Sequence, residues 1–148
     1  MATRSRIGLV NQDGSIDSIY CHFDGYISGN GRILDQHYNS LEKIQELIAL
    51  GDLSSLGEEI GLQHPFSSYE GFRGSEQDYK SMYGKMCTAY MRDRGETGCL
   101  PVHSDGVDDF LEIAEEYNYL FSPGVGEWMV DFGEGFQRLS AELQKEIA

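Results

Sequence analysis

The stretch of sequence that decides the fold is Thr3–Tyr26, TRSRIGLVNQDGSIDSIYCHFDGY. Two runs of alternating apolar residues flank the tetrapeptide Asn11–Gly14, and an Asp-Gly pair between such runs is typical of a β-hairpin. If Gly14 takes the left-handed position of a bulged three-residue turn, Ile7 falls opposite Ile19. A two-residue turn would instead set apolar residues against a serine. We therefore predict an antiparallel hairpin in the bulged register.

This register divides the side chains of the hairpin between two faces, because successive residues of a strand point to opposite sides. One face is apolar and is predicted to be buried in the core: Ile7, Leu9, Ile19, Cys21 and Phe23. The other face is polar and holds two of the few arginines of the chain beside a tyrosine and a histidine: Arg4, Arg6, Tyr20 and His22. The hairpin therefore supplies a core surface and a first candidate binding surface.

The composition is that of a globular protein. The chain has 148 residues, of which 40% are hydrophobic, and this is enough to bury a core. No run approaches the roughly 20 apolar residues of a membrane helix, and the first residues lack the apolar segment of a secretory signal. The three cysteines, Cys21, Cys87 and Cys99, are odd in number and widely spaced, which fits a reducing compartment. We expect a single cytoplasmic domain over residues 1–148, without membrane association.

The charge of the chain is strongly acidic and unevenly distributed. The formal net charge is −14, from 25 acidic and 11 basic residues. Residues 1–94 carry a net charge of −4 and residues 95–148 carry −10, and no Lys or Arg occurs from Gly95 to Gln137. Such a surface repels nucleic acids and membranes and attracts basic partners. The alternative is that the charge only keeps a small protein soluble.

The rest of the chain predicts further strands and helices from hydrophobic spacing, caps and turn residues. Helices are expected over 32–39, over 41–50 behind a capping box from Asn39 to Glu42, over 107–117 and over 136–147; a strand over 86–94, a second hairpin over 119–130 and a long loop over 64–83. Antiparallel strands with helices gathered elsewhere in the sequence indicate an α+β fold. We predict a mostly antiparallel sheet of about five strands, made of the N-terminal hairpin, a central strand and the C-terminal hairpin, with three or four helices.

Several blocks of this sequence carry a resemblance to a known group of proteins. The run TRSRIG followed by SIYCHFDGY, with LIALGDLSSLG, AYMRDRGE and EYNYLF further on, resembles an uncharacterised family of small proteins carried by tailed bacteriophages and prophages. The resemblance spans most of the chain and departs at Phe23, where the family has Trp, and at Ile27, where it has Pro. It implies a setting in the cytoplasm of an infected bacterium and a role in host takeover or counter-defence.

Clustered arginines form the first candidate site. The pair on the N-terminal hairpin and a second pair on the expected strand over 86–94 are predicted to share a sheet face with aromatic residues: Arg4, Arg6, Tyr20, His22, Tyr90, Arg92 and Arg94. Guanidinium groups bind phosphate or carboxylate through two parallel hydrogen bonds, so this face is a candidate anion pocket for a nucleotide. The alternative, favoured by the abundance of acids, is that the arginines pair internally with residues such as Asp17, Asp24 and Asp93.

The second candidate site is an acidic helix face. The expected helix over 107–117 places an apolar stripe toward the core and carboxylates toward solvent. The acidic residues are Asp108, Asp109, Glu112, Glu115 and Glu116. A row of carboxylates on a helix approximates the charge spacing of nucleic acid, about one charge per 1.7 Å of DNA axis. This face is therefore predicted to bind a basic surface on a host protein.

The sequence favours a binding protein over an enzyme. It contains no phosphate-binding loop, nucleophile elbow or dinucleotide fingerprint, and Cys21-His22 with Cys99 and His103 match no zinc-ligand spacing. We expect no metal, no cofactor and no direct binding of nucleic acid. The favoured function is binding and inhibition of a host factor with a basic surface. The alternatives are sequestration of a small anionic nucleotide by the Arg/His/Tyr face and a virion-associated role, and the oligomeric state stays open.

Overall fold

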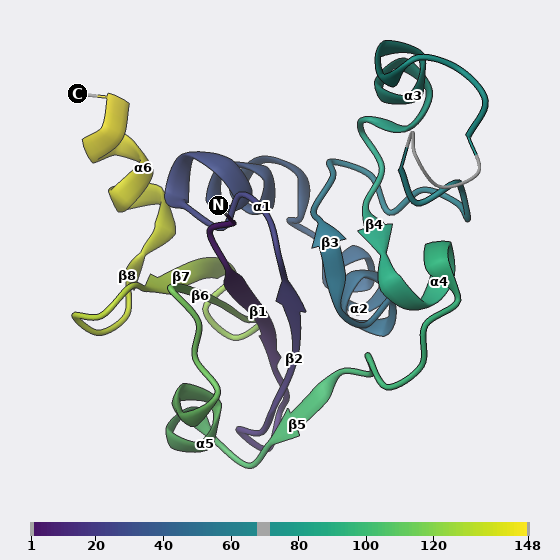
Figure 1. The fold of residues 1–148 in the computed structure, drawn as a ribbon. Coiled ribbons are helices and arrows are strands. Elements are labelled where there is room, and N and C mark those ends of the chain that lie inside the picture. Colours follow the sequence, from purple (N-terminus) through teal and green to yellow (C-terminus); the bar gives the residue numbers. More distant parts are fainter. Residues whose placement is uncertain (1, 68–71, 148) are drawn as a thin grey trace.

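The structure is a computed structural model that describes residues 2–67 and 72–147. Its strands are β1 (Ser5–Val10), β2 (Ile16–Cys21), β3 (Leu53–Ser55), β4 (Thr88–Ala89), β5 (Val102–Ser104), β6 (Tyr117–Ser122), β7 (Glu127–Asp131) and β8 (Gln137–Arg138). Its helices are the π-helix η1 (Ile27–Gly31) and the α-helices α1 (Arg32–His37), α2 (Leu41–Ala49), α3 (Glu76–Tyr83), α4 (Tyr90–Arg94), α5 (Val107–Glu112) and α6 (Leu139–Ile147). Figure 1 shows their arrangement.

The fold is α+β, as the sequence predicts, and is built on one mixed sheet. In the described part of the chain the sheet has eight strands in the order β4-β3-β2-β1-β6-β7-β8, with β5 paired to β2. The pairs β1–β6 and β2–β3 are parallel, and the other pairs are antiparallel. The prediction of about five strands and three or four helices is therefore wrong in detail. The strands that were not predicted, β3, β5 and β8, have only two or three residues each, too few to show a hydrophobic alternation in the sequence.

The N-terminal hairpin has the predicted register. Strands β1 and β2 pair antiparallel, with Ile7 opposite Ile19, and both of these side chains are fully buried. Gly14 has a φ of +87°, the left-handed conformation that the bulged turn requires and that glycine adopts without steric cost. The Asp13 carboxylate accepts a hydrogen bond from the backbone N–H of Ser15 at 3.0 Å, which holds the turn. The bulged register is confirmed.

Phe23 does not continue the apolar face of the hairpin, contrary to the prediction. Its side chain is 44% exposed. Strand β2 ends at Cys21, and Asp24 has a φ of +60°, so the alternation of faces stops before Phe23. The Phe23 ring packs edge-on against His22 instead, with ring centroids 4.6 Å apart. The prediction extended a strand pattern past the point where the chain turns.

Three other segments differ from their predictions for local reasons. The expected strand over 86–94 is only β4 followed by α4, because the Asp93 carboxylate accepts the N–H of Ala89 at 2.8 Å and starts a helix there. Helix α5 ends at Glu112 rather than at Tyr117, because Tyr117 already pairs with Ser5 of β1. Within the expected loop over 64–83, residues 68–71 lie outside the described part of the chain, and α3 forms behind a capping box between Ser75 and Asp78.

The start of α2 also differs from the prediction. Its N-cap is Ser40, whose side chain accepts the backbone N–H of Lys43 at 3.2 Å, rather than Asn39. The helices expected over 32–39 and 136–147 form as α1 and α6 with shorter bounds. The second hairpin forms from β6 and β7 in antiparallel pairing.

The sheet has a core face and an opposite face. The core face carries Ile7, Leu9 and Ile19, and buried leucines and isoleucines of α1, α2 and α6 pack against it. The opposite face carries Ile16 and Leu120, which pack against Phe110 of α5. Three helices therefore cover one face, whereas α5 covers one end of the other (Figure 1).

A glycine in the middle of β1 lets α5 approach the sheet. A Cβ atom at Gly8 would lie 2.7 Å from Leu120 Cδ2, 3.0 Å from Ile16 Cγ2 and 3.2 Å from Phe110 Cε1. Glycine usually weakens a strand interior and often marks a close approach of another segment. Here the space above Gly8 is filled by the Phe110 ring, which is fully buried.

We expect Phe23→Ala and Phe110→Ala to have very different effects on the free energy of unfolding. Truncation of the buried Phe110 removes the anchor of α5 and should cost about 3–5 kcal/mol, as for other buried aromatic residues. Truncation of the exposed Phe23 should cost under about 1 kcal/mol. Urea unfolding followed by circular dichroism measures both, and equal losses would contradict the placement of Phe23 outside the core.

Candidate functional site

Five of the seven residues of the predicted anion site lie on the opposite face of the sheet, beside the end covered by α5. We call the surface that they form the open face: Arg4, Arg6, Tyr20, His22 and Tyr90. The Tyr20 backbone N–H donates to Asp52 Oδ1 at 2.9 Å, and the Tyr90 N–H donates to the Asp52 carbonyl at 3.2 Å. Asp52 therefore holds the two tyrosines on neighbouring segments, although one comes from β2 and the other from the start of α4.

Arg6 is the buried member of the open face. Only 8% of the residue is exposed, and its guanidinium donates from Nε to the Ile113 carbonyl and from Nη1 to Ser18 Oγ, each at 3.1 Å. Burial lowers the pKa of Arg6, and the nearby carboxylates of Asp52 and Glu115 oppose this shift. Burial likewise raises the pKa of the Asp52 carboxyl. Charged groups of both signs therefore meet at this place in a partly desolvated setting.

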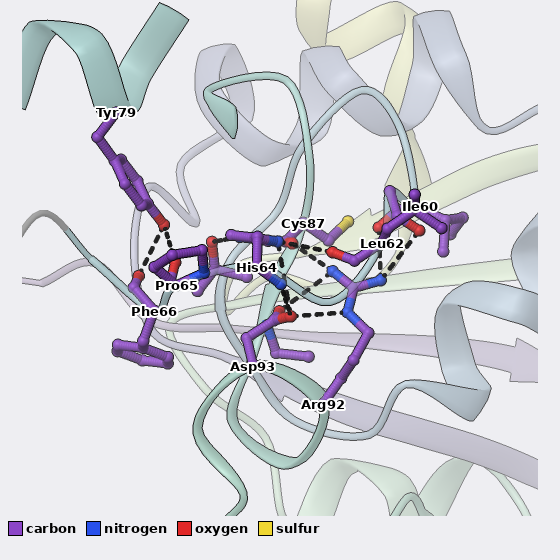
Figure 2. Close-up of polar contacts among 12 residues, drawn as sticks. Ile60, Leu62, His64, Pro65, Phe66, Tyr79, Cys87, Arg92 and Asp93 are labelled. Atoms are coloured by element: carbon purple, nitrogen blue, oxygen red, sulfur yellow. Dashed lines mark hydrogen bonds and ion pairs between the residues drawn. The ribbon is translucent and has the colours of Figure 1, made fainter. Parts of the chain in front are cut away.

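Arg92 lies in a different environment, shown in Figure 2, where it is the centre of a hydrogen-bond network. Its guanidinium donates to the carbonyls of Ile60, Gly61 and Cys87 and to both carboxylate oxygens of Asp93, over 2.7–3.3 Å. These are five hydrogen bonds, and a guanidinium has five N–H groups. Arg92 therefore has no N–H left for an external anion, which agrees with the internal-pairing alternative.

His64 completes this network beneath the side chain of Tyr83. Its ring stacks on Tyr83 with centroids 5.1 Å apart, and its Nδ1 lies 2.7 Å from the Leu62 carbonyl and 3.5 Å from Asp93 Oδ1. Its Nε2 lies 3.4 Å from Thr88 Oγ1. A Thr-His-Asp series of this kind has the residue types of a nucleophile with its base. All three side chains are buried or nearly so, however, so the network ties the 60–66 segment to α4 rather than facing a substrate.

Arg94 is also separated from Arg6 by the change from strand to helix at Tyr90. Its Nε lies 3.6 Å from Glu96 Oε2, and its guanidinium carbon lies 4.8 Å from the centre of the Phe66 ring. On a strand, Tyr90, Arg92 and Arg94 would have shared one face. In α4 Arg92 points away from Tyr90 into the interior, whereas Tyr90 and Arg94 lie on one side of the helix and both contact the Phe66 ring.

Four of the five predicted acidic residues are exposed and form what we call the acidic surface: Asp108, Asp109, Glu112 and Glu116. The first three lie on α5, and Glu116 follows in the turn before β6, where Glu116 Oε1 accepts the Arg4 backbone N–H at 3.5 Å. Glu115 is only partly exposed, and its charge acts on Arg6 and Tyr20. Glu115 therefore belongs beside the open face rather than to the acidic surface.

Two residues at these places were not among the sequence-predicted site residues. Asp52 follows the glycine that ends α2, and its position beside β2 depends on a parallel pairing of two short segments, Cys21 with Leu53. His64 lies in a segment that reads as loop. No local sequence pattern identifies either residue, because both obtain their role from contacts with residues distant in the chain.

Two buried cysteines and the cavity at the hairpin tips lack reactive groups. Burial raises the pKa of the Cys21 thiol to about 12 and also raises that of Cys87, so both stay protonated near neutral pH and are poor nucleophiles. Across residues 2–67 and 72–147, no group of three or more His, Cys, Asp or Glu residues is placed to hold a metal ion. A cavity of about 460 Å³ at the tips of the two hairpins is lined by Val10, Asn11, Gln12, Ser122, Pro123 and Gly124, none of which titrates.

Comparisons with known proteins give no relative: no family model, curated protein or solved structure matches the chain. No helix in the described part of the chain is long and apolar enough to cross a membrane. The function must therefore be inferred from the surfaces themselves.

We expect Asp93→Ala to destabilise the protein by about 3 kcal/mol or more, because it leaves the charge of Arg92 and the N–H groups of His64 and Ala89 without their acceptor. The matched control is Glu96→Ala, which removes an exposed carboxylate that pairs with Arg94 and should cost under about 1 kcal/mol. Thermal and urea unfolding measure both. Similar losses in the two variants would show that the buried network contributes no more than a surface pair.

The His103–Asp17 pair should be visible in a pH titration. His103 Nδ1 lies 2.7 Å from Asp17 Oδ1, and this hydrogen bond raises the pKa of His103 above its usual value. The pair therefore adds stability below the ordinary histidine pKa and loses it as the pH rises through the raised value. Nuclear magnetic resonance of the ring protons should give a raised midpoint that Asp17→Asn lowers. A midpoint unchanged by Asp17→Asn would contradict the pairing of β5 to β2 through this contact.

Proposed function

We propose that this protein binds a host protein through the acidic surface and inhibits it. The observation that carries the proposal is the charge distribution: residues 95–148 have a net charge of −10, and the segment from Gly95 to Gln137 has no Lys or Arg. Exposed carboxylates of that segment gather on α5. A field of one sign speeds encounter with a partner of the opposite sign and discourages others.

The composition of the acidic surface favours a protein partner. Beside its carboxylates, α5 exposes two apolar side chains, Val107 at 43% and Leu111 at 37%. Exposed apolar residues within a polar rim are the usual anatomy of a protein–protein interface. The carboxylates supply attraction and orientation, and the apolar residues supply area that is removed from water on binding. A basic groove that normally holds nucleic acid has the matching charge.

The position of α5 suits such a role, because the helix is held mainly from one side. Phe110 packs into the sheet, while Asp108, Asp109, Leu111 and Glu112 face solvent. The interface residues therefore differ from the residue that anchors the helix. The resemblance to a phage family supports a bacterial host factor as the partner, in host takeover or counter-defence, and inhibition follows if the occupied groove is the partner's working surface.

The proposal predicts that Asp108→Lys with Glu112→Lys weakens capture of the partner. Both residues are exposed on α5, and their reversal should lower the association rate about tenfold or more at low salt. The control is Glu42→Lys with Glu46→Lys, an exposed pair with the same spacing on α2 and the same change in net charge. Partners captured from bacterial lysate are identified by mass spectrometry, purified and measured by biolayer interferometry over a range of salt concentrations.

The control separates a local surface from general charge. If the α2 reversal slows association as much as the α5 reversal, the net charge acts and the acidic surface has no special role. If the α5 reversal leaves association and its salt dependence unchanged, the acidic surface is a solvated face. In either case the proposed mode of binding is wrong.

A further inference from the structure

One buried arginine of the open face has donor groups that the protein does not use. Arg6 is 8% exposed, and its two hydrogen bonds leave Nη2 without a partner among the described residues. Nη2 is absent from the fully buried polar atoms that lack a partner, so it reaches the protein surface. No carboxylate of the described residues lies within the 4.0 Å of an ion pair with Arg6. A guanidinium that is mostly desolvated and still presents a free edge is prepared to bind an anion.

Arg6 and Arg92 differ in how many of their N–H groups are hydrogen-bonded within the protein. Arg92 donates all five N–H groups to internal acceptors, as a structural arginine does. Arg6 donates only two N–H groups to internal acceptors, and these two hydrogen bonds hold its guanidinium in place. Its direction is therefore fixed while its outer nitrogen is free. Such pre-orientation lowers the entropic cost of binding a ligand.

Aromatic side chains share the open face with Arg6, and Tyr20 lies directly opposite it on the neighbouring strand. Tyr20 lies on β2 and His22 follows the strand, with the Tyr20 hydroxyl 2.6 Å from His22 Nδ1, and the Tyr90 hydroxyl is hydrogen-bonded to Ser54 on β3. Each of the three rings is partly exposed. The hydroxyls and the imidazole are therefore oriented by neighbours, and the remaining ring surface faces outward. Base rings of nucleotides stack on aromatic side chains of this kind.

Charges at the margin of the open face restrict the ligand further. Arg4 is exposed and its charge reaches Tyr20, so a second guanidinium stands beside Arg6. Asp52 and Glu115 also act on Arg6, and the Asp52 carboxylate accepts an N–H donor, that of Tyr20. A ligand that fits carries an anionic group for the arginines, a flat ring for the tyrosines and N–H groups for a carboxylate. A nucleotide has all three.

We propose that the open face binds a small nucleotide, with its phosphate at the two arginines and its base against the tyrosine rings. A single nucleotide is favoured over a nucleic acid strand, because the net charge of −14 repels a polyanion more strongly than it repels one phosphate group. A guanine base fits best, since its edge presents two N–H donors to a carboxylate such as Asp52. This site adjoins the acidic surface, since Glu116 Oε1 accepts the Arg4 backbone N–H, but it uses other residues and does not rest on the proposed function.

Isothermal titration calorimetry on the full chain tests the site with 5′-GMP, 5′-UMP, guanosine, inorganic phosphate and a short single-stranded DNA. We expect 5′-GMP to bind most tightly, because only the complete nucleotide engages the arginines, the rings and the carboxylate. Flat titrations with both nucleotides would overturn the proposal. Equal affinity for 5′-GMP and 5′-UMP would overturn the role of the base, and tighter binding of the DNA would overturn the assignment to a small ligand.

Variants place the ligand on the structure. Arg4→Glu changes an exposed residue and should lower the affinity for 5′-GMP about tenfold or more, since a charged contact to phosphate is lost. Arg6→Lys keeps the charge, loses the fork and should act in the same direction. The control is Arg138→Ala, an exposed arginine on β8 whose Nε lies 2.7 Å from Glu127, which should bind as the wild type does.

Circular dichroism and the Tm establish that each variant is folded before it is titrated. If Arg6→Lys fails to fold, Arg4→Glu still decides the outcome, because its side chain lies at the surface. Wild-type affinity in Arg4→Glu, or an equal loss in Arg138→Ala, would show that the nucleotide binds elsewhere.

Discussion

The pairing of β1 on both of its edges is the constraint on which the rest of the structure depends. Strand β1 is antiparallel to β2 and parallel to β6, so the first strand of the chain is a central strand of the sheet. Both of its faces are buried: Ile7 and Leu9 against the helices of the core face, and Gly8 beneath Phe110. A shift by one residue would exchange these faces. It would bring Arg6 into the core and expose Ile7. The register of β1 therefore determines both the position of α5 and the residues of the open face.

The sequence predicts those parts of the fold that have a local signal. The Asp13-Gly14 turn and the alternation around Ile7 and Ile19 are sufficient for the hairpin, and the heptad-like spacing from Leu41 onward is sufficient for α2. The remaining differences come from contacts between distant residues. Ala89 is capped by Asp93, β3 pairs with β2 at a single position, and α5 is cut short by the pairing of Tyr117. These contacts cannot be recognised from a short stretch of sequence. Periodicity alone therefore predicts too long a strand over 86–94 and too long a helix over 107–117.

The same limit applies to the candidate site. Four arginines look alike in the sequence, and two alternatives, an anion pocket or internal pairing, stay open for all of them. The structure gives Arg92 five internal acceptors and Arg6 only two. The difference arises because Arg92 lies in a helix beneath a loop whose carbonyls point inward, whereas Arg6 lies on a strand at the margin of α5. The number of internal acceptors that an arginine finds depends on its neighbours in the fold, and the residue type alone does not predict it.

Opposite charges lie close together in this molecule without neutralising each other. Glu115 and Glu116 are neighbours in the chain, yet Glu115 acts on Arg6 while Glu116 stays at the surface. The turn between α5 and β6 therefore separates a mixed, partly desolvated face from an exposed acidic one. Screening weakens the interactions of exposed charges beyond about 8–10 Å at physiological salt, but weakens those of buried groups much less. The acidic surface and the exposed Arg4 should thus respond to salt, whereas contacts at the buried Arg6 should respond little.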